Sequence, residues 1–241
     1  GHLAVLAGHT IVLADAEGQA VGDFALERSY VEDVAISSAE GLVYAVGFDN
    51  ERNGNPVQVP YLVAHGLDDL EQRFQVWGYA AADLDDDMAD SRLYRVVIGD
   101  DGGLYALGEV AGGNTVFRWN GRDLSTPTLI TTDPYNHATN TGSEHKGYLA
   151  ALDPATGEVR RGLMIIARLS NGRGNTFKPR GLAVDADGVT YVAGLSAARF
   201  AGRDQNFIDG EPVGEYAGGD PSLLVVTPDF RERLRWTTFV R

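Results

Sequence analysis

The stretch Arg180-Gly-Leu-Ala-Val-Asp-Ala-Asp-Gly-Val-Thr-Tyr-Val-Ala-Gly194 holds two short apolar runs around an Asp-Gly turn, and the second run contains Tyr-x-x-Gly. Residues 31–47 and 93–108 repeat this plan, so that Tyr44, Tyr105 and Tyr191 occupy equivalent positions. Two short runs joined by a tight Gly-containing turn are typical of a β-hairpin. The three stretches therefore predict three equivalent hairpins.

A second kind of hairpin follows in at least two copies. Residues 60–77 and 221–236 each contain a β-rich run, an Asp-containing turn and alternating polar and apolar residues that end at Trp77 or Trp236. Residues 10–24 and 148–163 match the same plan more loosely. Two hairpins make a unit of four antiparallel strands, and a recurring unit of this size indicates a blade of a β-propeller.

The predicted fold class is therefore all-β, a β-propeller or propeller segment of about four four-stranded blades, with an outer hairpin strand missing from the first. We expect residues 1–241 to form a single domain or a fragment of one. Insertions at 120–146 and 196–219 are rich in Gly, Asn, Asp and Thr and are predicted to be long surface loops, which in a compact domain are usually functional or disordered. Residues 80–91 lack an apolar stripe and predict a loop with at most one helical turn.

Composition limits the classes of partner. The chain has 241 residues, 30 of them Gly, and a hydrophobic content of 44%, which suits a packed and turn-rich core. A net charge of −14 argues against nucleic acid as a partner. No apolar run reaches the ~18 residues of a membrane span, so no membrane insertion is expected. The absence of Cys excludes disulfides and thiolate chemistry.

Residues 180–196 resemble the hairpin "avDxxGnxYvxG" of the bacterial seven-bladed β-propeller repeat family, and residues 220–239 resemble its second hairpin, "DaflvkldpdGxxxWst". Members of that family are large secreted or surface proteins. The resemblance therefore implies an extracellular, periplasmic or cell-surface location. It says little about chemistry, because the motifs specify a blade.

A second resemblance is weaker. Residues 148–157, Tyr-Leu-Ala-Ala-Leu-Asp-Pro-Ala-Thr-Gly, are similar to a blade element of quinoprotein dehydrogenases. In those enzymes a Trp ends the element and docks the next blade, whereas Arg160 and Arg161 follow here. A strand with an Asp-Gly turn is the favoured interpretation.

The acidic run at 83–90 is the sharpest candidate for a metal site. Asp83, Asp85 and Asp87 alternate along a loop and could supply the carboxylate oxygens that Ca²⁺ prefers. The run departs from an EF-hand, since Met88 stands where Gly is required. A solvated acidic loop explains the run equally well. Calcium is the one cofactor that the sequence suggests.

Other acidic and aromatic residues have simpler explanations. The Asp residues at 100, 101, 185 and 187 lie at predicted hairpin turns, where Asp serves the backbone. Trp77 and Trp236 could stack on sugars, but their places in the repeat favour core packing. The loop residues Asp133, His137, Glu144 and His145 leave a metal or catalytic site conceivable.

The leading functional hypothesis is a non-enzymatic extracytoplasmic structural or interaction module. One alternative is an enzyme that acts on carbohydrate or another small substrate at the mouth of the propeller, where the long insertions would gather. A glycan-binding lectin is another. Residues 3–8 read as the late strand of a first hairpin whose earlier partner is missing, and residues 233–241 contain, from Trp236 onward, the outer strand of a blade. We therefore expect protein partners, or other segments of a longer chain, to cover these open ends, because exposed sheet edges and apolar faces are rarely tolerated.

Overall fold

The computed structural model describes residues 1–53, 55–85, 87–128, 144–198, 207–208, 210–212 and 219–238. In this part of the chain the only helices are two single 3-10 turns, η1 (Ala81–Asp83) and η2 (Val116–Arg118). The prediction of an all-β chain is confirmed, as is that of at most one helical turn within residues 80–91.

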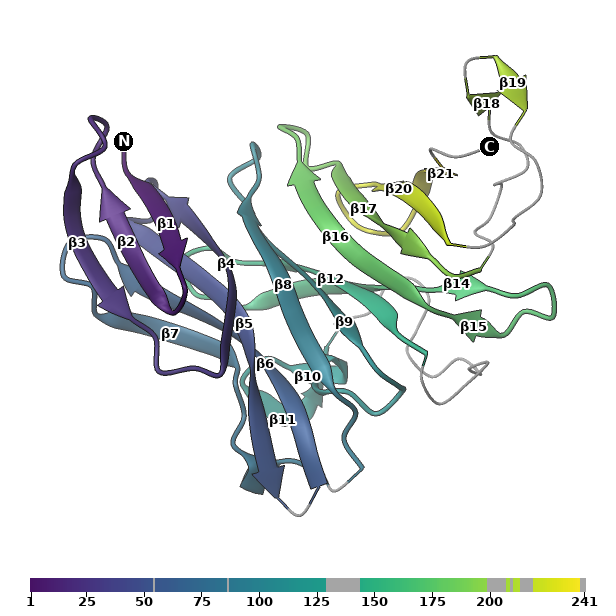
Figure 1. The fold of residues 1–241 in the computed structure, drawn as a ribbon, viewed down its shortest axis with the longest axis horizontal. Helices are drawn as coiled ribbons and strands as arrows, with labels where there is room; N and C mark the ends of the chain where they lie inside the picture. Colours follow the sequence, from purple (N-terminus) through teal and green to yellow (C-terminus); the bar gives the residue numbers. More distant parts are fainter. Residues whose placement is uncertain are drawn as a thin grey trace.

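Four antiparallel sheets follow one another along the chain, and we number them 1 to 4 (Figure 1). Sheet 1 contains β1 (Leu3–Ala7), β2 (Thr10–Ala14) and β3 (Ala20–Ala25). Sheet 2 contains β4 (Tyr30–Ser37), β5 (Leu42–Asn53), β6 (Asn55–Gly66) and β7 (Gln72–Trp77). Sheet 3 contains β8 (Ser91–Ile98), β9 (Leu104–Val110), β12 (Lys146–Leu152) and β13 (Val159–Ile165). Sheet 4 contains β16 (Phe177–Val184), β17 (Thr190–Ser196), β20 (Asp220–Val226) and β21 (Arg233–Thr238).

Short two-stranded ribbons decorate these sheets. They are β10 (Trp119–Asn120) with β11 (Asp123–Pro127), β14 (Ala167–Arg168) with β15 (Gly174–Asn175), and β18 (Phe207–Ile208) with β19 (Glu211–Pro212). The first and third ribbons belong to the predicted insertions. Most of those insertions, at 129–143 and 199–218, lies outside the described residues apart from the third ribbon and Gly210.

The three Tyr-containing runs are equivalent strands, as predicted. Tyr44, Tyr105 and Tyr191 lie on β5, β9 and β17, the second strands of sheets 2, 3 and 4. The glycine three residues later pairs in each sheet with the residue just before a register shift in the first strand; the pairs are Gly47 with Val31, Gly108 with Leu93, and Gly194 with Pro179. The same β-bulge therefore recurs in all three sheets.

The bulge explains why this position is glycine. A Cβ on Gly47 would lie 2.0 Å from the carbonyl oxygen of Tyr30, and one on Gly108 would lie 2.0 Å from that of Arg92. A Cβ on Gly194 would lie 2.8 Å from the carbonyl oxygen of Lys178. Each bulged strand thus pushes a carbonyl into the space that a side chain would need, and only glycine leaves that space open.

Sheet 1 shows the converse. In sheets 2, 3 and 4 the register shifts between the third and the fourth strand, and in sheet 1 the same shift lies between β2 and β3. This shift aligns β1, β2 and β3 with the second, third and fourth strands of the other sheets. Ala7 then stands at the glycine position of the repeat, on the edge strand β1, where no bulged strand pairs with it.

The strand that sheet 1 lacks is thus the innermost one. The first strands of sheets 2 to 4 line the inner side of the arc, because β4 lies against β8 and β8 lies against β16. The expectation that the first blade lacks an outer strand was wrong. The expectation that residues 3–8 form the late strand of a first hairpin whose earlier partner is missing is confirmed, because β1 aligns with the second strands of the other sheets.

Successive sheets pack face to face through three apolar clusters. One joins sheets 1 and 2, around Ile11 and Val63; the second joins sheets 2 and 3, around Leu62 and Tyr148; the third joins sheets 3 and 4, around Leu149 and Phe177. Figure 1 places sheets 1 and 4 on opposite sides of the molecule, with sheets 2 and 3 between them. The described residues therefore form an arc of sheets.

Both repeat tryptophans pack in the core, with exposed fractions of 2% for Trp77 and 5% for Trp236. They are not equivalent, however. Trp77 pairs with Tyr61, whereas Trp236 pairs with Leu224, the residue that corresponds to Val63. Trp236 therefore aligns with Gln75, and the sequence alignment of the two Trp residues was wrong by two positions.

The glycine at the bulge is expected to be irreplaceable. Gly108→Ala should lower the free energy of unfolding by roughly 2 kcal/mol, since a methyl group must displace a main-chain carbonyl. Gly181→Ala is the control, because its Cβ would meet only Ala193 Cβ at 3.5 Å; it should change stability by less than about 0.5 kcal/mol. Urea unfolding measures both, and equal stabilities would contradict the role given to the bulge.

Candidate functional site

The connections between strands divide the arc into two ends. Because the strands are antiparallel, the turns after first and third strands leave from one end, which we call the hairpin-turn end. The connections after second and fourth strands leave from the opposite, loop-bearing end. It carries the tip between β5 and β6, segment 78–90, and both insertions, since 111–145 joins β9 to β12 and 197–219 joins β17 to β20.

A buried carboxylate lies at the loop-bearing end of sheet 3. Glu109, near the end of β9, has a side chain that is only 7% exposed. Its Oε1 accepts hydrogen bonds from Arg92 Nη1 at 2.8 Å and from the Tyr94 hydroxyl at 2.7 Å, and it lies 3.1 Å from Nδ1 of His145. We call Arg92, Tyr94, Glu109 and His145 the Glu109 cluster.

The bulge helps to assemble this cluster. Arg92 pairs directly with Glu109 across the two strands, and Tyr94 is the bulged residue that the register of β8 skips. Arg92 lies over the Phe48 ring at 5.6 Å from its centre, and the Tyr94 ring meets the same Phe48 edge to face. The cluster therefore ties sheet 3 to sheet 2 at the loop-bearing end.

Burial and hydrogen bonding shift the pKa values of two members of the cluster, Tyr94 and Arg92. Desolvation raises the pKa of Tyr94 to about 12, so its hydroxyl stays protonated and donates. Burial opposes the charge of Arg92, but its hydrogen bond with Tyr94 and the attraction of Glu109 outweigh burial and raise the pKa of Arg92. The groups are thus bound to one another, and Oε1 of Glu109 already has three polar neighbours.

Sequence reasoning missed Arg92, Tyr94 and Glu109. One signal was present, because Glu109 is the single charged residue of a strand, Leu104–Val110, whose residues are all buried. Burying a carboxylate in such a strand is costly unless partners compensate it. His145 was a candidate, but its partner is Glu109 of another strand, and Asp133 and His137 lie outside the described residues.

A second buried pair adjoins the cluster. Lys146, the first residue of β12, is completely buried, and its Nζ lies 3.9 Å from Oε1 of Glu144, which is 1% exposed. Desolvation lowers the pKa of Lys146, with Glu144 opposing and Arg168 reinforcing the shift. A Cβ on Gly174 would lie 2.5 Å from Glu144 Oε1, so this glycine makes room for the carboxylate.

The acidic segment is held by two apolar residues. Leu84 and Met88 are 8% and 9% exposed and pack into the cluster between sheets 2 and 3, while Asp83, Asp85 and Asp87 are exposed. Asp87 Oδ1 accepts a hydrogen bond from Asn114 Nδ2 at 2.8 Å. Among the described residues no group of three or more His, Asp or Glu could hold a metal ion, and Asp86 is not among them. The calcium site stays a prediction.

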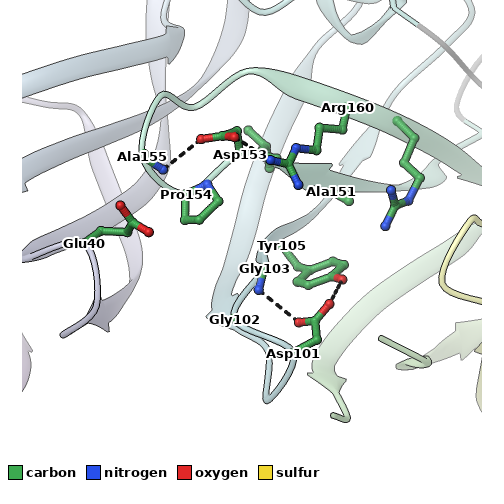
Figure 2. A pocket seen from close by; sticks show the side chains of 12 residues that line it. Glu40, Asp101, Gly102, Gly103, Tyr105, Ala151, Asp153, Pro154, Ala155 and Arg160 are labelled. Carbon is green, nitrogen blue, oxygen red and sulfur yellow. Dashed lines mark hydrogen bonds and ion pairs between the residues drawn. The ribbon is translucent and has the colours of Figure 1, made fainter. Parts of the chain in front are cut away.

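The hairpin-turn end carries a cleft of about 290 Å³ between sheets 2 and 3 (Figure 2). Asp101 Oδ1 accepts from the Gly103 amide at 3.0 Å, and its Oδ2 accepts from the Tyr105 hydroxyl at 2.7 Å. Asp153 accepts from the Ala155 amide at 2.9 Å and pairs with Arg160. The carboxylates of Asp101 and Asp153 therefore serve the turns of sheet 3, and Glu40 lines the cleft from the turn of sheet 2.

The same holds for the equivalent turn of sheet 4. Asp185 Oδ1 accepts from the amides of Asp187 and Val189, each at 3.0 Å, and Asp185 Oδ2 accepts from the Tyr191 hydroxyl at 2.9 Å. The prediction that the turn aspartates serve the backbone is confirmed for Asp101 and Asp185, whereas Asp100 and Asp187 lie in the same turns with no side-chain hydrogen bond to the backbone among the described contacts. Residues 148–157, which resemble a quinoprotein element, form strand β12 and a turn whose Gly157 has φ +72°.

Comparisons with known proteins support the fold and nothing finer. No protein-family model matches the chain, and no curated protein matches it. Solved structures match over the whole chain: the WD40 domain of Neurospora crassa Pan2 (TM-score 0.48, 10% identity) and quinohemoprotein alcohol dehydrogenase from Comamonas testosteroni (TM-score 0.54, 12% identity). A third is the β-propeller domain of Myceliophteria thermophila Cps50 (Swd1), with a TM-score of 0.29 and 10% identity.

The chain covers 52% of the Pan2 domain, 34% of the alcohol dehydrogenase and 90% of the Cps50 domain. At such identities a likeness concerns the fold alone. The predicted β-propeller class is confirmed. No helix among the described residues is long and apolar enough to cross a membrane.

The Glu109 cluster is expected to stabilise the fold. Glu109→Gln should lower the free energy of unfolding by about 2 kcal/mol, because it removes the nearer charged partner of the partly buried Arg92 and leaves only Asp90, at 4.0 Å. The control is Asp229→Asn, since Asp229 and its partner Arg231 are 59% and 75% exposed at 3.8 Å; it should cost under about 0.5 kcal/mol. Denaturant unfolding at pH 7 compares them, and a larger loss in the control would refute the assignment.

Calcium binding by the acidic segment is testable by melting. If Asp83, Asp85 and Asp87 bind Ca²⁺, chelation should lower the melting temperature and added calcium should restore it, because a ligand of the native state stabilises by mass action. A variant with all three changed to Asn should not respond. An unchanged melting curve of the wild-type chain in chelator would leave only a solvated loop.

Proposed function

We propose that this chain is a non-enzymatic interaction module of the β-propeller class, and that it binds a protein partner at its loop-bearing end. The observation that carries the proposal is topological. Segment 78–90 and both insertions leave from the same end of neighbouring sheets, whose faces pack through buried apolar clusters. Variable loops on a rigid scaffold are the usual arrangement of a binding surface.

The Glu109 cluster supports a scaffold in preference to an enzyme. A general base needs an accessible carboxylate or imidazole within reach of a substrate. Here the Glu109 side chain is 7% exposed, and the cluster's own Arg92, Tyr94 and His145 surround its Oε1. The four side chains of the Glu109 cluster connect β8 and β9 with the residue just before β12.

Charge indicates the chemistry of the partner. Asp83, Asp85 and Asp87 are exposed at the loop-bearing end, and the chain carries a net charge of −14. A partner surface rich in Lys and Arg complements such a face and associates faster with it at low salt. Residues 180–196 and 220–239 resemble repeats of secreted and surface proteins. This resemblance supports membership of that bacterial repeat family and, with it, an extracytoplasmic location.

The proposal is tested by partner capture with chemical cross-linking in extracts of the source cells. The wild-type chain should retain a partner cross-linked to residues 78–90 or 111–128. A variant with Asp83, Asp85 and Asp87 changed to Asn should lose it. The matched control changes three exposed acidic residues at the hairpin-turn end, Glu40→Gln, Glu158→Gln and Asp187→Asn, and should retain it.

Cross-links confined to the hairpin-turn end, or equal loss in both variants, would contradict the proposed face. The alternatives have their own readouts. Turnover of a panel of glycosides that Glu109→Gln abolishes would favour the enzyme. Retention on a glycan array would favour the lectin, for which Trp119, partly exposed under the Arg118 guanidinium at 5.2 Å, is the available stacking platform.

A further inference from the structure

Within the described part of the chain, each of the two outermost sheets leaves one apolar face uncovered. Seven large hydrophobic residues are exposed among those described, and three of them lie on these faces: Leu3 (56%) and Val5 (47%) on sheet 1, and Leu195 (40%) on sheet 4. Faces of this kind mark sites of association. The repeat itself indicates what kind of surface fits them.

The outward face of sheet 4 corresponds to faces that are buried elsewhere in the same chain. Registers align its residues Tyr191, Ala193, Leu223 and Val225 with Tyr44, Val46, Leu62 and Ala64 of sheet 2 and with Tyr105, Leu107, Leu149 and Ala151 of sheet 3. The eight residues of sheets 2 and 3 are at most 3% exposed, because the next sheet covers them. The four of sheet 4 are partly exposed.

The outward face of sheet 1 is the complementary half of that interface. Leu3, Val5 and Val12 align with Val43, Ala45 and Val63 of sheet 2, which are at most 1% exposed under sheet 1. They also align with Leu104, Ala106 and Ala150 of sheet 3, which are completely buried under sheet 2. Sheet 1 thus presents the face that a preceding sheet covers, and sheet 4 presents the face that a following sheet covers.

Charge distinguishes the two faces. Residues 1–27 contain Asp15, Glu17, Asp23 and Glu27 and no Lys or Arg. The outward face of sheet 4 carries the exposed cations Lys178 and Arg235 instead. An acidic apolar face and a basic apolar face attract each other, whereas two copies of the same face repel.

The contacts of residues equivalent to Arg235 indicate how the faces meet. Registers align Arg235 with Phe74 of sheet 2 and Arg161 of sheet 3. Phe74 packs against Gly157, and Arg161 lies 5.0 Å from the centre of the Phe230 ring. Both partners lie in the turn between the third and fourth strands of the following sheet. The same turn in sheet 1 is residues 15–19, which carry the exposed Glu17.

We propose that two copies of this chain associate head to tail, with the outward face of sheet 4 of each copy packed on the outward face of sheet 1 of the other. Two arcs of four sheets then make a ring of eight, within the ~4–8 blades of closed propellers. A head-to-tail interface must close into a ring or extend into a filament, and closure by two copies uses every exposed face. Arg235 of each copy then faces Glu17 of the other.

Light scattering coupled to size-exclusion chromatography tests the stoichiometry. The purified chain should have twice the 25.9 kDa mass of one copy. Leu223→Asp on sheet 4 and Val5→Asp on sheet 1 should each raise the dissociation constant of the pair at least roughly 100-fold, since each buries an unpaired charge. Far-UV circular dichroism and melting confirm that both variants remain folded.

Mixing these two variants identifies the geometry. The Val5→Asp variant keeps an unchanged sheet 4 face, and the Leu223→Asp variant keeps an unchanged sheet 1 face. These two faces can still form one intact interface, so the mixture should form a heterodimer, whereas neither variant should dimerise alone. Charge exchange at exposed positions is a second test. Arg235→Glu should weaken the pair, and adding Glu17→Arg in the same chain should restore it, with the effect of the single variant fading at high salt.

Three results would overturn the proposal. A monomer at all concentrations would mean that other segments or proteins cover these faces. A dimer that mixing does not restore would mean that like faces meet. A continuous series of larger masses would mean an open filament instead of a closed pair.

Discussion

The close approach of a main-chain carbonyl to each repeat glycine is the constraint on which the arc of sheets depends. The bulge behind that carbonyl shifts the alternation of the inner strand, and the residues just after it reach the neighbouring sheet. Asp33 Oδ2 accepts from the Val96 amide at 3.1 Å, and Arg95 Nε donates to the carbonyl of Arg180 at 3.1 Å. The first strands of sheets 2, 3 and 4 are thereby hydrogen-bonded to one another along the inner side of the arc.

The same irregularity organises the loop-bearing end. Tyr94 is the bulged residue of β8, and it meets Glu109 of β9 beside Arg92. A buried carboxylate in an apolar strand would destabilise the sheet on its own. Surrounded by a guanidinium, a hydroxyl and an imidazole, it holds together the strand ends that segment 111–145 connects. The scaffold and the candidate binding face therefore share one structural origin.

Particular residues show how far sequence reasoning reached. Turn aspartates such as Asp185 were predicted correctly, because an Asx turn depends on residues within four positions. The two tryptophans were aligned wrongly, because each follows an alternating run and register is decided by cross-strand pairing. Glu109 was missed, because its partners Arg92 and His145 are 17 and 36 residues away. The acidic residues at 83–87 were singled out, but Leu84 and Met88 prove to anchor that segment.

By itself, the sequence determined the strands, the tight turns and their recurrence, because strand alternation, Asp-Gly turns and the Tyr-x-x-Gly spacing act over a few residues. Only the tertiary structure decided why the glycine is required, how the two tryptophans align and which faces of the described sheets stay uncovered. These properties arise from contacts between strands and sheets that are distant along the chain. In such contacts a carbonyl, a carboxylate or an apolar face acquires its role from the neighbour packed against it.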